Sequence, residues 1–180
     1  MRSMKWLVVA LACGMVVPAA MGAALLTQGS NEIGISGNLD TAAVGGTDYD
    51  LSGNYAHFFW DRLSMGARAM VGGNDWWSYF GVGLTSEYNF TMPEGFRPLF
   101  GTDLVPFFLG LAMDFRSTNL DDRENAVVFC AEAGSKFFLT DSTALVASMV
   151  GEMGTEDIYY DEDEPTDKNL KFQLGLRFYF

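Results

Sequence analysis

In several segments of the sequence, apolar and polar residues alternate. Seven charged residues occupy the polar positions of these segments, and they are the first candidates for chemistry. They are Arg68, Lys136, Lys171 and Arg177, with Glu87, Asp114 and Glu132. The same positions otherwise carry mostly Gly, Ser, Asn and Ala, which suits a narrow enclosed space. Charges in a partly dry interior need partners, so these residues predict a salt-bridge network that plugs the interior. A conducting path or a proton relay is the alternative.

Catalysis by acyl transfer would need a hydroxyl nucleophile and a general base within hydrogen-bond reach. The single histidine is His57, and neither a serine nor an acid is paired with it by spacing. It lies beside Phe59 on the apolar parity, so we predict that it packs at an interface. We assign no catalytic residue and no cofactor, and expect the protein not to be an enzyme.

An acidic segment near the C-terminus is the remaining candidate for ligand binding. Residues 156–164 contain six carboxylates interleaved with Tyr159 and Tyr160. The spacing differs from that of an EF-hand loop, and exposed charge runs are usually just solvated. We therefore assign no metal site. Weak binding of divalent cations that also bridge lipopolysaccharide phosphates is the alternative.

The amino-acid composition excludes several classes of protein. Of 180 residues, 49% are hydrophobic and 19% are charged, which excludes a disordered chain. The formal net charge is −12, so nucleic acid is not an expected partner. Of the two cysteines, Cys13 lies in the leader described next, which leaves Cys130 without an intramolecular disulfide partner.

The N-terminal segment has the pattern of a secretory signal peptide. Two basic residues precede an apolar run over 6–17, and small residues dominate 18–24. We predict that residues 1–24 are a signal peptide and that 25–180 form one domain. A retained membrane anchor and a lipoprotein processed at Cys13 are the alternatives.

The remaining chain alternates with the period of a β-strand. In the last segment Leu170, Phe172, Leu174, Leu176, Phe178 and Phe180 alternate with mostly polar residues. Similar alternation occurs in seven further segments, at 33–39, 49–59, 63–71, 80–90, 105–115, 127–137 and 145–149. Eight strands with seven connections fit the length of the domain.

The predicted connections differ in length. Those at 60–62 and 140–142 are tight, whereas those at 40–48, 116–125 and 152–169 are long and acidic. Short turns at one end and long loops at the other are typical of outer-membrane barrels. The connection at 91–104 is the exception, because it is long on the side where turns should be short.

The large apolar residues indicate which face of the sheet meets lipid. They would overfill an eight-stranded interior, whereas the small and polar residues of the other face would fit it. Such a sheet must close in a bilayer, because an open edge would leave backbone groups unpaired. We therefore predict an all-β, eight-stranded, antiparallel, up-and-down transmembrane β-barrel. A soluble lipocalin-like barrel or β-sandwich is the alternative. The expected membrane girdle is Tyr55, Phe59, Trp60, Trp76 and Trp77.

Three short motifs carry a resemblance to a known superfamily. The ending 175–180, Gly-Leu-Arg-Phe-Tyr-Phe, looks like the C-terminal signal of outer-membrane barrels. Residues 133–141 are similar to the sixth-to-seventh-strand hairpin of OmpA/OmpX/OmpW-like barrels, and 105–110 resembles their fifth strand. The resemblance implies that the barrel assembly machinery reads Leu174, Leu176, Phe178 and Phe180. It also implies an outer-membrane location among lipids that include lipopolysaccharide.

The function expected from these observations is structural or interactive. We predict a monomeric outer-membrane barrel with a charge-plugged interior and acidic surface loops, whose surface ligand the sequence does not name. A small channel for hydrophobic or small solutes, as in OmpW-like proteins, is the alternative. A lipid A-modifying barrel enzyme is a more distant one.

Overall fold

The computed structural model contains β-structure and turns and describes most of the chain. The described residues are 26–43, 46–75, 77–90, 107–119, 125–161 and 164–180. Within them, no helix is long and apolar enough to cross a membrane.

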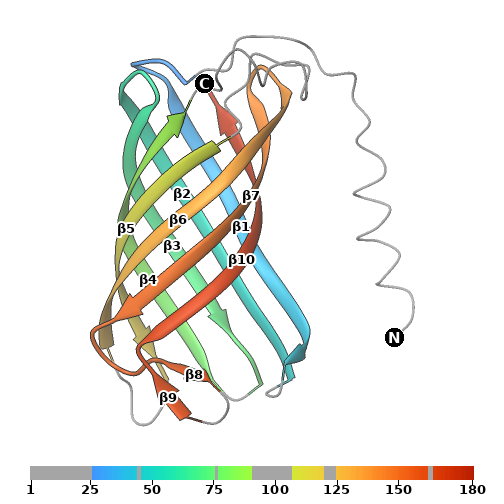
Figure 1. The fold of residues 1–180 in the computed structure, drawn as a ribbon, viewed down its shortest axis with the longest axis vertical. Coiled ribbons are helices and arrows are strands. Elements are labelled where there is room, and N and C mark those ends of the chain that lie inside the picture. The colour runs from blue at the N-terminus through green and yellow to red at the C-terminus, as the bar shows by residue number, and fades with distance from the viewer. Residues whose placement is uncertain (1–25, 44–45, 76, 91–106, 120–124, 162–163) are drawn as a thin grey trace.

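Eight antiparallel strands close into a barrel (Figure 1). The strands are β1 (Asn31–Ala43), β2 (Gly46–Trp60), β3 (Leu63–Gly73), β4 (Ser78–Phe90), β5 (Phe107–Thr118), β6 (Asn125–Thr140), β7 (Thr143–Gly154) and β10 (Lys168–Tyr179). Neighbours in the chain are neighbours in the sheet, and β10 pairs with β1 to close it. The predicted all-β, eight-stranded barrel is confirmed.

Several predicted loops are shorter than expected, because the strands continue into them. Only residues 44–45 separate β1 from β2, where a loop over 40–48 was expected. The connection after β7 contains a separate two-stranded hairpin, formed by β8 (Tyr159–Asp161) and β9 (Glu164–Thr166). Polar residues such as Arg116 and Glu152 suggested loops, but they lie at strand ends with their side chains buried in the interior. The connection at 91–104 lies outside the described residues.

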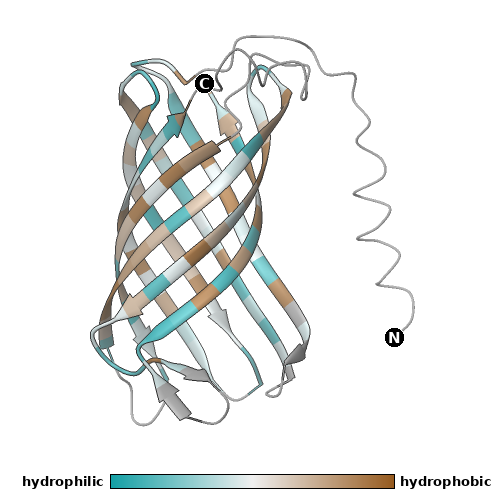
Figure 2. Ribbon diagram, viewed as in Figure 1, coloured by the Kyte–Doolittle hydropathy of each residue, from teal (hydrophilic) through white to brown (hydrophobic). Residues whose placement is uncertain are grey.

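The two faces of the barrel wall have opposite character. Outward side chains are large and apolar, such as Leu111 at 68% exposed and Leu170 at 69%. Inward side chains are buried and mixed, and Phe58 and Val128 are 0% exposed. Apolar and polar residues accordingly alternate along the strands in Figure 2. An apolar exterior around a polar interior is the arrangement of a barrel that sits in lipid.

Apolar side chains close the interior at the end of the barrel where β1 begins and β10 ends, here called the terminus end. Leu26, Phe58, Phe138, Ala144 and Tyr179 form a buried cluster there. The segment before β1 is fixed over this cluster, because the Arg62 amide donates to the Leu26 carbonyl at 2.8 Å. Arg62 itself turns the β2–β3 hairpin with a φ of 69°. This end is therefore covered by side chains and by chain.

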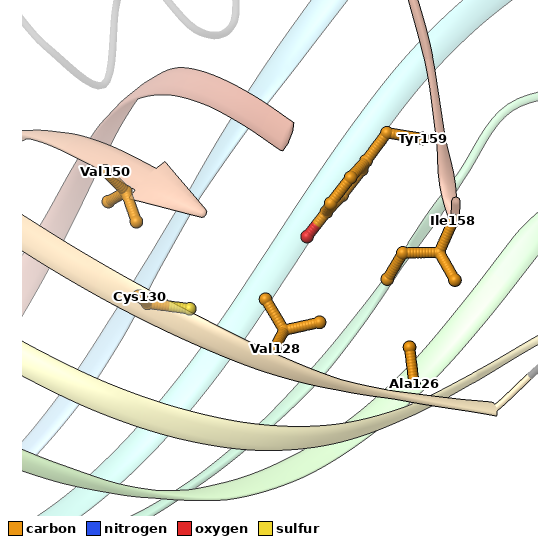
Figure 3. Close-up of a cluster of buried hydrophobic side chains, with 6 residues drawn as sticks. All are labelled: Ala126, Val128, Cys130, Val150, Ile158 and Tyr159. Atoms are coloured by element: carbon orange, nitrogen blue, oxygen red, sulfur yellow. The ribbon is translucent and has the colours of Figure 1, made fainter. Parts of the chain in front are cut away.

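A second apolar cluster closes the opposite end, here called the loop end (Figure 3). Ile158 and Tyr159, which follow β7, fold back over the interior. They pack on Val128 and Cys130 of β6 and on Val150 of β7. Ile158 is 4% and Tyr159 is 8% exposed, so this part of the predicted surface loop is buried.

Phe58 and its outward neighbour Phe59 offer a test of this inside-outside assignment. Replacing Phe58 with Ala should destabilise the barrel by about 3–5 kcal/mol, because a cavity remains in a packed interior. Replacing Phe59 with Ala should cost less, because detergent or lipid fills the space. The midpoint of unfolding in micelles measures both. An equal or larger loss for Phe59→Ala would contradict the assignment.

Candidate functional site in the barrel interior

Every strand of the barrel contributes at least one charged side chain to the interior. The ion pairs fall into two groups along the barrel axis. The terminus-end cluster consists of Glu32, Glu87, Lys136 and Arg177. The loop-end cluster consists of Asp50, Arg68, Asp114, Arg116, Glu152 and Lys171.

Lys136 is the centre of the terminus-end cluster. Its side chain is 0% exposed, and Nζ lies 3.2 Å from Glu32 Oε2 and also donates to Glu87 Oε1. Arg177 Nε lies 3.1 Å from the second oxygen of Glu32. These contacts join β1, β4, β6 and β10 across the interior. Two cations are thus matched by two carboxylates.

Aromatic rings border this cluster toward the terminus end. The Lys136 ammonium lies 5.2 Å from the centroid of the Phe108 ring and 5.5 Å from that of Tyr179. Cations are attracted to such ring faces, most strongly where water is excluded. The Phe108 ring lies over Gly134, its partner across β5 and β6. A Cβ at that glycine would meet the ring at 2.6 Å, so the close approach requires glycine.

Arg116 is the centre of the loop-end cluster. Its guanidinium contacts Glu152 at 2.6 Å and Asp114 at 3.0 Å, and it donates to the Tyr159 hydroxyl at 2.8 Å. Asp114 also receives two parallel hydrogen bonds from Arg68, at 2.7 and 2.6 Å. Paired bonds of this kind are among the stronger polar contacts in proteins. Arg116 thereby connects the strand network to the residue that covers the loop end.

Lys171 extends the loop-end cluster to β2 and β10. Its Nζ lies 3.0 Å from Glu152 Oε1 and also donates to Asp50. The Tyr79 hydroxyl donates to the same Asp50 carboxylate at 2.5 Å. Three cations and three carboxylates are therefore present in this cluster.

A small cavity separates the two clusters. Its volume is about 20 Å³, which is room for about one water molecule. Glu132, Thr85 and Ser64 are among its lining residues. The ion pairs described above join ten interior charges, five of each sign, and Glu132 is not one of the ten. Between the two clusters, the described side chains therefore leave little free volume.

The predicted network residues all point into the barrel, but they are only part of the set. Six of the seven make ion pairs, and Glu132 lines the cavity. Sequence reasoning missed Glu32, Arg116 and Glu152 because they were assigned to segments outside the strands. Asp50 lies within the strand predicted at 49–59 but is not among the seven predicted network residues. The available signal was the two-residue period, since Arg116 follows Asp114 by two residues and Glu152 follows Val150 by two.

Residues predicted for the exterior are distributed as follows. Tyr55, Phe59 and Trp60 are exposed near the terminus end, as are Phe178 and Phe180. Leu174 is exposed and Leu176 is half-buried on the same strand. Trp77 stacks on Tyr79 with 5.7 Å between ring centroids, and Trp76 lies outside the described residues.

His57 has contacts of a packing residue. Its Nδ1 is 3.0 Å from the Asn31 side-chain oxygen, and its ring meets Phe59 edge to face at 5.0 Å. Of the acidic segment, Glu156 and Asp157 are exposed, whereas residues 162–163 lie outside the described part. No group of three metal-ligating side chains occurs in the part of the chain that the structure describes.

Tyr159 has a role that the acidic segment did not suggest. Besides accepting from Arg116, its hydroxyl donates to Glu152 Oε2 at 3.0 Å. Burial raises the pKa of Tyr159 above its ordinary value, and the Glu152 carboxylate acts in the same direction. The tyrosine therefore stays a neutral hydrogen-bond donor over the physiological range.

Arg116 and Lys168 allow the interior network to be tested. Replacing Arg116 with Met should destabilise the folded barrel by about 3–5 kcal/mol, because Glu152 and Asp114 lose a buried partner. Replacing the exposed Lys168 of β10 with Met should cost at most about 1 kcal/mol. The temperature at which the folded band disappears on SDS gels compares the two. Equal midpoints would show that the Arg116 contacts do not stabilise the barrel.

Comparison with known proteins identifies the fold. No family model and no curated protein matches the chain. A similar solved structure is the N-terminal β-barrel domain of Pseudomonas aeruginosa OprF, with 19% identity, 85% of this chain and 98% of that chain covered, and a TM-score of 0.56. Neisserial surface protein A (NspA) is also similar, with 12% identity, 84% and 96% covered, and a TM-score of 0.52. The chain therefore has the fold of the small eight-stranded outer-membrane β-barrels.

Proposed function

We propose that this protein is a closed outer-membrane barrel with a structural or surface-interaction role, and that it does not conduct solutes. The observation that carries the proposal is that interior charges form ion pairs in a barrel whose two ends are covered by buried apolar clusters. Ten interior charges have partners, and the cavity between the clusters has room for about one water molecule. A path for ions would have to break several buried ion pairs.

The surroundings proposed for the barrel follow from its exterior. Large apolar side chains project outward from all eight strands, which suits contact with lipid acyl chains. We propose that the barrel is a monomer in the outer membrane, among lipids that include lipopolysaccharide. On this proposal the barrel assembly machinery reads the outward residues of β10, and the loop end faces the cell exterior. A partner at the surface would then meet the loops, where Glu156 and Asp157 are exposed.

The alternative of a small channel for hydrophobic solutes has less support. Apolar side chains do line parts of the interior, notably Phe58, Phe108 and Met70. The terminus-end cluster interrupts them, because fully buried Lys136 lies against Phe108 and is held by two carboxylates. Within the described part of the chain, His57 gives no support to lipid A-modifying activity, because it is bonded to Asn31 and packed on Phe59.

Planar-bilayer recording tests the proposal directly. Protein whose folding is verified by its heat-dependent gel mobility should give no stable conductance steps, because the interior charges stay paired. A Tyr159→Ala, Arg116→Ala variant, which removes the cover and the centre of the loop-end cluster, should show more frequent current fluctuations. Stable steps from the wild-type barrel would overturn the closed-barrel proposal and favour a channel.

A further inference from the structure

The β1–β10 junction differs from the other junctions of the barrel. Pairing there covers only Glu32–Gly37 of β1 and Leu174–Tyr179 of β10. Gly37 lies opposite Leu174, so a continued ladder would place Asn38 opposite Gln173 and Leu39 opposite Phe172. The two strands do continue, but they do not pair. Toward the loop end they diverge, as the blue and red strands do in Figure 1.

The divergence is not caused by either strand ending early. β1 keeps its ladder with β2 as far as Ala43, with one irregularity after Asp40. β10 keeps its ladder with β7 as far as Lys168. Each strand is therefore an ordered edge that lacks a neighbour on one side. We call this feature the β1–β10 split; it comprises residues 38–43 and 168–173.

Part of the split lies at the depth of the apolar exterior. Leu39, Leu170 and Phe172 flank it, and all three are exposed on the outer surface. Backbone groups facing hydrocarbon without hydrogen bonds cost several kcal/mol each. Whatever occupies the split must therefore reach it from the membrane and offer polar atoms as well as apolar ones.

A groove on the outer surface joins the split at Asn38 and continues over the paired part of the same junction. Its volume is about 630 Å³. Its apolar lining includes Ile35, Leu51, Leu174 and Leu176, and its polar lining includes Asn38 and Asp50. Asp50 also belongs to the loop-end cluster, so the groove reaches from the lipid face toward the interior.

Side-chain bonds hold the wall together behind the split. Lys171 of β10 donates to Asp50 of β2, and Gln173 Nε2 lies 3.5 Å from the same carboxylate. These contacts join β10 to β2 past the intervening β1. They limit how far the two strands separate.

We propose that this groove, together with the end of the β1–β10 split that it joins at Asn38, is a binding site for an amphiphile of the surrounding leaflet. The acyl chain lies on Ile35, Leu51 and Leu174, and an ester, amide or hydroxyl group bonds to Asn38 and to the open strand edges. An amphiphile fits better than an added β-strand, because the groove extends beyond the edges over β2 and β7, which a strand would not cover. The site is independent of conduction, so a current through the interior would not remove it.

Two cysteine pairs in a Cys130→Ser background test whether the split is open. Leu39→Cys with Phe172→Cys spans the split, whereas Ile35→Cys with Leu176→Cys is the matched pair in the closed part of the same junction. A disulfide needs Cα atoms within about 7 Å. We expect the closed-part pair to oxidise at least about tenfold faster in folded barrels. Equal oxidation rates would mean that β1 and β10 pair along residues 38–43 and 168–173 as well. That result would overturn the proposed binding site.

Photolabelling identifies the occupant. A diazirine-bearing palmitoyl lysophosphatidylcholine in micelles should label the groove residues, and Leu51→Trp, which fills the groove, should reduce that labelling severalfold. Leu84→Trp on β4 is the control and should leave it unchanged. Even labelling around the exterior, or labelling unaffected by Leu51→Trp, would mean ordinary lipid contact only. A co-purifying polypeptide crosslinked at Leu39→Cys would mean a strand occupant; each of these results overturns the proposal.

Discussion

Charge pairing inside a narrow barrel is the interaction on which the rest of this structure depends. Eight strands leave an interior that side chains alone can fill, so a charge placed there has little water to solvate it. Each strand contributes such a charge, and each of the paired cations is bound by carboxylates from other strands. The network therefore fixes the strands relative to one another as well as filling the space.

The ends of the barrel and the interior network support each other. Tyr159 covers the loop end and at the same time bonds to Arg116 and Glu152. At the terminus end, the Phe108 and Tyr179 rings cover Lys136 and meet its ammonium. Excluding water strengthens these ion pairs, because the local dielectric is low. This arrangement is what supports the proposal of a closed, non-conducting barrel.

The fold could be predicted from the sequence because a two-residue period is visible in short segments. The alternation from Leu170 to Phe180 fixes a strand without reference to its neighbours. Strand ends could not be fixed in this way, since Arg116 and Glu152 are as polar as loop residues. Their inward direction becomes evident only when the period is carried past the last apolar residue.

Other features depend on contacts between distant parts of the chain. Nothing near Tyr159 in the sequence indicates that it meets Arg116, which is 43 residues away. The β1–β10 split joins the first and last strands, and local alternation is the same in strands that pair and strands that do not. The sequence thus allowed the prediction that charged side chains lie in the interior, but it did not allow the partner of each charge to be predicted.

A double-mutant cycle on Arg68 and Asp114 tests the central role of charge pairing most directly. The four proteins are wild type, Arg68→Met, Asp114→Asn and the double variant, each unfolded reversibly in micelles. The paired hydrogen bonds at 2.7 and 2.6 Å predict a coupling free energy of about 1–3 kcal/mol, with the double variant less destabilised than the sum of the singles. Additive effects within about 0.3 kcal/mol would contradict the account, because the two charges would then stabilise the barrel independently.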